Sequence, residues 1–129
     1  MDSRYQVSDD YDGREALRGE DESTLAIHKI FADFTPEPMA YGSFNSVPDL
    51  HYSICKFYKL AEGLPEPSQF CTRTAALHNK SISPNGKVGF CVITYFRDLP
   101  QKNAYTDTWE ECFTNGFRHM LGLNHERGN

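Results

Sequence analysis

Residues 109–121 hold the most constraining pattern in this sequence, a set of apolar residues at steps of three and four. These residues are Trp109, Cys112, Phe113, Phe117, Met120 and Leu121. At 100° per residue they share one face, which predicts an amphipathic helix. Three residues can cap its start: Thr106, Asp107 and Thr108. Glu110 and Glu111 complement the dipole of its first turn, and Gly122 is expected to end it.

The rest of the chain predicts a mixed fold. We expect a helix over residues 49–61 that Asp49 caps, and strands over residues 71–77 and 87–96. An Asn85-Gly86 turn would join the two strands in an antiparallel hairpin. The expected fold class is therefore α+β, with a short antiparallel sheet packed against two main helices.

Charge is distributed unevenly along the chain. Residues 1–24 carry a net charge of −5, whereas residues 25–129 are neutral overall. We therefore expect a flexible acidic leader over residues 1–24 and a single globular domain over residues 25–129. A neutral domain offers no basic face to phosphates, so no nucleic-acid partner is expected. No apolar run approaches the roughly 18 to 20 residues that a membrane span needs, so no membrane partner is expected.

Cellular location and redox state stay open. The N-terminus lacks the pattern of a signal peptide, so the chain is either cytoplasmic or a secreted or periplasmic protein whose signal peptide has been removed. Its cysteines are Cys55, Cys71, Cys91 and Cys112. They permit two disulfides in three connectivities, and buried free thiols are the alternative.

Two histidines near the end of the chain have a spacing that suits a metal site. In His119-x-x-Gly122-x-x-His125, one imidazole projects from the last helical turn and the glycine reverses the chain, so that the second imidazole returns to meet the first. Two imidazoles are a normal part of a zinc site, which makes zinc the expected cofactor. Cys112, Asn115, Glu126 or a distant residue would complete the ligand set. The alternative is two ordinary histidines near a helix C-terminus.

Residues 117–127 resemble the second half of the metzincin zinc-protease signature, H-E-x-x-H-x-x-G-x-x-H. Glu126, directly after the last histidine, is especially similar to the astacin branch. The resemblance implies a zincin-like fold with His119 and His125 as metal ligands, and it leaves Glu126 as the candidate catalytic base. Asn115 and Gly116 stand where the family has its first ligand histidine and its catalytic glutamate. A standard metzincin mechanism therefore cannot be written.

A second, looser resemblance covers residues 70–126. Cys112 and the Leu121-Gly122-Leu123 triplet are similar to the C-x-x-E-E-x-x-Q-x-L-G-L-x-N-D segment of an exported bacterial family of unknown function, itself zincin-like. Its Glu-Glu pair is again replaced by Asn115-Gly116. Because full zinc proteases of this type are longer, both resemblances imply a reduced or truncated zincin relative.

Three functions follow from these patterns. The first is a metallopeptidase-related domain that binds zinc without standard peptidase activity. The second is a non-catalytic module that binds a peptide or protein through its acidic N-terminal tail or through aromatic loops containing Tyr41, Phe44 and Tyr52. The third is an active hydrolase with a rearranged site, in which Glu110, Glu111 or Glu126 is the base.

Overall fold

The structure, a computed structural model, describes residues 3–8, 11–59 and 62–128. The elements in chain order are β1 (Ser3–Ser8), α1 (Tyr11–Ile30), β2 (Pro38–Ser43), β3 (His51–Lys56), α2 (Pro67–Lys80), β4 (Tyr95–Phe96), β5 (Leu99–Pro100) and α3 (Trp109–Arg127). The expected α+β class is confirmed: three helices accompany two small antiparallel sheets in the described part of the chain. None of the described helices is long and apolar enough to cross a membrane.

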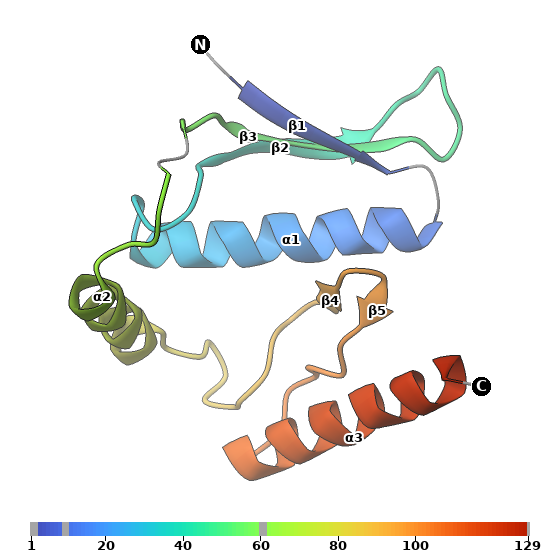
Figure 1. The fold of residues 1–129 in the computed structure, drawn as a ribbon. Helices are drawn as coiled ribbons and strands as arrows, with labels where there is room; N and C mark the ends of the chain where they lie inside the picture. Colours follow the sequence, from blue (N-terminus) through green and yellow to red (C-terminus); the bar gives the residue numbers. More distant parts are fainter. Residues whose placement is uncertain (1–2, 9–10, 60–61, 129) are drawn as a thin grey trace.

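The elements form layers. The larger sheet has the strand order β1-β3-β2, and α1 lies along one of its faces (Figure 1). On the other side of α1 lie β4 and β5, and α3 lies beyond them (Figure 1). Gly19 allows α1 to approach β4 closely, because a Cβ at this position would lie 2.5 Å from the carbonyl oxygen of Ile93. Gly19 is accordingly buried.

The helix expected over residues 49–61 is wrong, because residues 51–56 form the central strand β3. These residues alternate between the two faces of the sheet, and their backbone is hydrogen-bonded on both sides, to β1 and β2. Asp49 does not cap a helix. Its φ of 59° places it in the turn between β2 and β3, a conformation that Asp tolerates better than most residues.

Within the segment expected to be a flexible acidic leader, residues 1–24, the described residues 3–8 and 11–24 form β1 and most of α1. Residues 1, 2, 9 and 10 lie outside the described part. Leu17 of α1 is 2% exposed, so this segment supplies the most enclosed large side chain in the described part of the molecule. The segment is acidic, but the run Arg14-Glu15-Ala16-Leu17-Arg18 consists of good helix formers. The helix α1 continues across the boundary expected between residues 24 and 25.

The strand expected over residues 71–77 lies inside helix α2. Glu66 caps this helix by accepting a hydrogen bond from the Gln69 amide at 2.8 Å, and Pro67 occupies its first position. Proline is favoured there because that amide needs no partner within the helix. The hairpin expected between residues 71–77 and 87–96 is therefore wrong.

Most of the strand expected over residues 87–96 is irregular. Only Tyr95 and Phe96 pair as β4, with β5, and Val88 forms a single bridge to Thr106. Gly89 interrupts the strand, because its φ is +143°. A Cβ at this position would lie 2.7 Å from the Tyr105 backbone, so the two segments approach closely here. Residues 88–96 thus fold back on residues 99–106 as a loose antiparallel loop.

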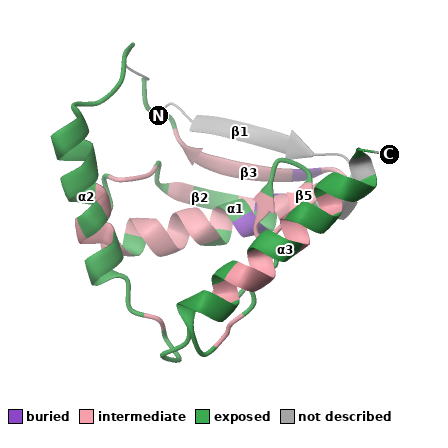
Figure 2. Cartoon of the chain, turned by 60° about the horizontal axis from the view of Figure 1, so that its bottom comes forward, coloured by how far each residue is buried: buried purple, intermediate pink, exposed green. Residues whose placement is uncertain are grey.

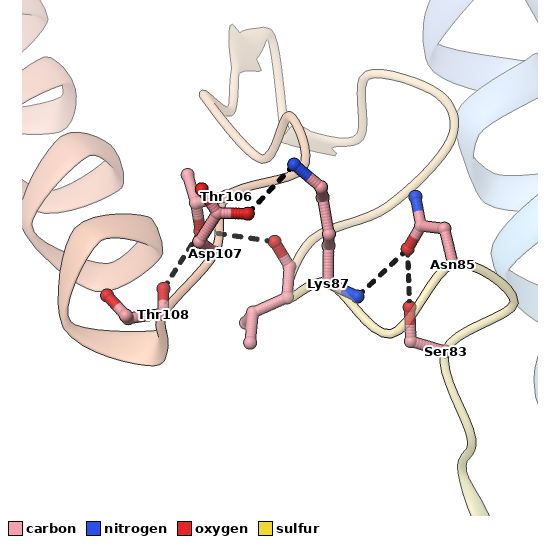
Figure 3. A network of polar contacts seen from close by, with 7 residues as sticks. Ser83, Asn85, Lys87, Thr106, Asp107 and Thr108 are labelled. Atoms are coloured by element: carbon pink, nitrogen blue, oxygen red, sulfur yellow. Dashed lines mark hydrogen bonds and ion pairs between the residues drawn. The ribbon is translucent and has the colours of Figure 1, made fainter.

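Polar side chains fix the two ends of this loop (Figure 3). The Asn85 carboxamide oxygen accepts hydrogen bonds from the Lys87 amide at 3.0 Å and from the Ser83 hydroxyl at 2.8 Å, which confirms the turn expected at Asn85-Gly86. The Lys87 ammonium then pairs with the Asp107 carboxylate at 2.8 Å. This ion pair links the turn to the residues that precede α3.

The C-terminal helix is confirmed, but not its end. Thr108 is the cap, and its hydroxyl accepts a hydrogen bond from the Glu111 amide at 3.2 Å. The helix does not stop at Gly122. It continues to Arg127 and is capped by Gly128. A continuous helix keeps the backbone hydrogen bonds that a turn at Gly122 would break, at the modest cost of a glycine in its interior.

The molecule is open rather than closely packed. Its accessible surface is 9955 Å², against the roughly 6,900 Å² that size scaling gives for a compact monomer of 14.7 kDa. Figure 2 shows that exposed residues cover much of α2 and α3, while burial concentrates where α1 meets the larger sheet. The helix α3 is therefore only partly covered by the rest of the chain.

Candidate functional site

The structure does not bring the two expected metal ligands together. His119 is half-buried, and its Nε2 donates a hydrogen bond to the Pro100 carbonyl oxygen at 3.0 Å. His125 is exposed. Six residues of uninterrupted helix separate them by about 9 Å along the axis and about 120° around it. The reversal at Gly122 that would join the imidazoles is absent.

The other expected members of that site are also spread around α3. Glu126 is exposed and follows His125 on the helix, whereas Cys112 and Asn115 are half-buried. Among the residues that the structure describes, no three His, Cys, Asp or Glu side chains are grouped so that they could hold a metal ion. Zinc binding and a catalytic role for Glu126 stay predictions.

The four cysteines carry free thiols in the structure. Cys71 and Cys91 are exposed, and Cys55 and Cys112 are half-buried. Neither alternative from the sequence describes all four, since none is disulfide-bonded and two are exposed.

A polar cluster between the sheet and α1 was not anticipated. His51 of β3 is 5% exposed, and its Nδ1 lies 2.7 Å from the Ser43 hydroxyl, on the residue directly opposite it in β2. The pair gives a buried imidazole a hydrogen-bond partner across the two strands, which is a structural role. The alternation of side chains in β3 would have revealed the cluster, had residues 51–56 been recognised as a strand.

Asp21 of α1 belongs to the same interior. Burial raises the pKa of the Asp21 carboxyl, and the Glu22 carboxylate raises it further, while a hydrogen bond with Ser53 lowers it. The Oδ1 atom of Asp21 is buried without a hydrogen-bond partner, as is Nδ1 of His28, seven residues later on the same side of α1. Such groups destabilise a fold unless a ligand or water satisfies them.

A shallow hollow of about 360 Å³ lies at the start of α2, lined by Ser68, Gln69, Thr72 and Arg73. The Arg73 guanidinium pairs with Asp33 at 2.9 Å, and the Glu66 carboxylate caps the helix. These two carboxylates offset the positive charge that would attract an anion to this helix end.

The clearest surface feature is a row of large side chains on α3, which we call the outer stripe: Trp109, Phe113, Phe117 and Leu121. Their exposed fractions are 68%, 57%, 55% and 54%. The ring centroids of Trp109 and Phe113 are 6.1 Å apart, and those of Phe113 and Phe117 are 5.8 Å apart with nearly parallel planes. The apolar pattern of the sequence therefore divides in two, since Cys112 and Met120 are half-buried while the outer stripe lies open to solvent.

The aromatic residues expected to engage a partner from loops are placed differently. Tyr41 and Tyr52 are half-buried residues of β2 and β3. Phe44 directly follows β2, is exposed, and packs edge-on against Tyr52 with 5.1 Å between centroids. These residues support one another, so they are a weaker candidate surface than the outer stripe.

No model of a known protein family matches the chain, and no curated protein is similar to it at a significant level. The metzincin resemblance is therefore supported by the pattern of residues 117–127 alone.

Proposed function

We propose that this chain is a non-catalytic protein-binding module and that the outer stripe is its binding surface. The observation that carries the proposal is the exposure of four successive large apolar residues at steps of four along α3. Continuous apolar patches of this kind mark interaction sites, whereas single exposed apolar residues need no explanation. The matching surface is an apolar face of a helix, because i, i+4 rows of one helix pack against those of another.

The open architecture supports the proposal. The accessible surface of 9955 Å² leaves an incomplete core that a partner can extend. Aromatic residues dominate the outer stripe, and aromatic residues are enriched at the centres of protein interfaces. The surface is on a regular helix, so little conformational entropy is lost when a partner binds.

A zincin-like fold with a zinc pair at His119 and His125 is a separate proposal. Its support is the half-motif His119-x-x-Gly122-x-x-His125 followed by Glu126. It requires α3 to end near Gly122, so it describes a second conformation of the C-terminal segment.

The binding proposal is tested with a synthetic amphipathic helix that has leucines on one face, used as a surrogate partner. We expect the wild-type chain to bind this peptide and the variant F113S/F117S to bind it at least tenfold more weakly, because truncating central aromatic residues commonly costs about 2 kcal/mol or more each. Isothermal titration calorimetry measures both affinities.

Two controls make the test specific. F70S removes a phenylalanine of α2 that is 52% exposed, close to the 55% of Phe117, and should leave the affinity unchanged. A peptide of the same composition with its leucines scattered around the helix should not bind. Equal affinity of the wild type and F113S/F117S, with both chains folded by circular dichroism, contradicts the proposal.

A further inference from the structure

The charged side chains beside the outer stripe indicate which kind of protein surface can bind it. Glu110 and Arg118 are separated by eight residues, about 12 Å along α3, and both lie on the same flank of the stripe. Both are exposed. Thr114 lies between them on this flank. The neighbouring Glu111 is set further around the helix, where its charge acts on Lys87. The flank thus carries one acid towards its N-terminal end and one base towards its C-terminal end.

We infer that the outer stripe is covered by α3 of a second copy of this chain, with the two helices antiparallel. The inference rests on the proposed function and names its partner. In an antiparallel pair related by a twofold axis, equivalent flanks meet in opposite directions. Glu110 of each copy then lies across from Arg118 of the other, which forms two equivalent ion pairs. The opposed helix dipoles favour the same orientation.

The stripe itself suits a self-pairing surface. Its centre lies between Phe113 and Phe117, so a twofold axis there stacks these residues of one copy against Phe117 and Phe113 of the other. Trp109 of each copy would meet Leu121 of the other, which matches the largest side chain with the smallest of the four. A surface that is complementary to itself in this way is the requirement for a twofold dimer.

The area that the outer stripe can bury determines the affinity expected for the dimer. Aromatic side chains carry about 150–250 Å² each, so the exposed fractions leave roughly 400–500 Å² of outer stripe uncovered per copy. Two copies bury roughly 900 Å² together, and the flanking residues bring the total to about 1,000 Å², the lower end of specific interfaces. We therefore expect a reversible dimer with a dissociation constant in the micromolar range.

Sedimentation equilibrium of the whole chain, from about 1 to 500 micromolar, tests the inference. We expect a monomer at the low end and a dimer at the high end. The charge reversals E110R and R118E should each weaken the dimer by about three- to tenfold, because each change places two like-charged pairs at the interface. The double variant E110R/R118E should restore the wild-type constant, since it exchanges the two charges.

The control is E20R, which reverses an exposed charge on α1 rather than on α3 and should leave the dimer unchanged. A chain that stays monomeric over the whole range overturns the inference. So does a dimer in which the two reversals do not compensate each other. A monomer that still binds the amphipathic peptide through Phe113 and Phe117 retains the proposed function with another protein as the partner. A monomer that binds no peptide loses both.

Discussion

Asp21 is the residue whose environment conflicts most with its charge. It faces the sheet from α1, its Oδ1 atom is buried without a partner, and burial raises its pKa. Its carboxyl binds a proton more tightly in the folded chain than in the unfolded chain. The ionised form therefore reduces stability at neutral pH, and this cost disappears as the pH falls through the raised pKa.

We expect D21N to raise the free energy of unfolding by about 1 kcal/mol at pH 7, because it removes a charge from a site that does not fully satisfy it. The advantage over wild type should vanish as the pH falls below 3.8, the ordinary value for this group. Urea unfolding at several pH values measures both effects. E20Q, an exposed change on the same helix, is the control. A D21N chain no more stable than E20Q at pH 7 would refute this account of Asp21.

Among the elements, α3 was predictable from sequence because its determinants are local. Its apolar spacing, its cap at Thr108 and the acids of its first turn all lie within about fifteen residues. The strand β3 was not predictable in this way, because its central position in the sheet depends on hydrogen bonds to β1, more than forty residues earlier, as well as to β2, which precedes it across a short loop. The helix α2 had one local signal that the sequence interpretation passed over, Pro67 at its first position.

The sequence predicted the outer stripe only in part, because its exposure also depends on residues outside α3. Periodicity places Trp109, Phe113 and Phe117 on one face of a helix. Whether that face is covered depends on where the irregular residues 88–106 lie, and no periodic pattern specifies their path. The sequence therefore predicted an apolar face, but not that part of it is exposed.

Gly122 separates the two descriptions of the C-terminal segment. It lies inside α3, and a Cβ at this position would meet nothing within 4 Å. We therefore expect G122A to raise the free energy of unfolding by up to about 1 kcal/mol, the difference in helix propensity between glycine and alanine. Thermal unfolding followed by circular dichroism measures the change.

The comparison variant is G19A, whose Cβ would lie 2.5 Å from the Ile93 carbonyl oxygen, so this variant should be less stable than wild type. The metzincin-like arrangement predicts the reverse at Gly122. A chain that turns there loses stability in G122A, and zinc would then raise the melting temperature of the wild type but not of the variant.

At the scale of the whole molecule, the account depends on the contrast between an enclosed α1 and an open α3. The sheet covers α1 on one side and β4 approaches it from the other (Figure 1). Exposed residues cover much of α3 (Figure 2), and each residue of the outer stripe is more than half exposed. A chain with this distribution gains apolar burial when another protein surface covers α3. The central claim is therefore that another protein surface covers the outer stripe when the protein functions.

Acrylamide quenching of Trp109 tests that claim most directly, because Trp109 is the single tryptophan of the chain and lies in the outer stripe. We predict efficient quenching in the dilute chain, where Trp109 is 68% exposed. Protection and a shift of emission to shorter wavelength should appear at high chain concentration or with saturating amphipathic peptide, and both should be lost in F113S/F117S. Equal quenching of Trp109 under all of these conditions would contradict the account.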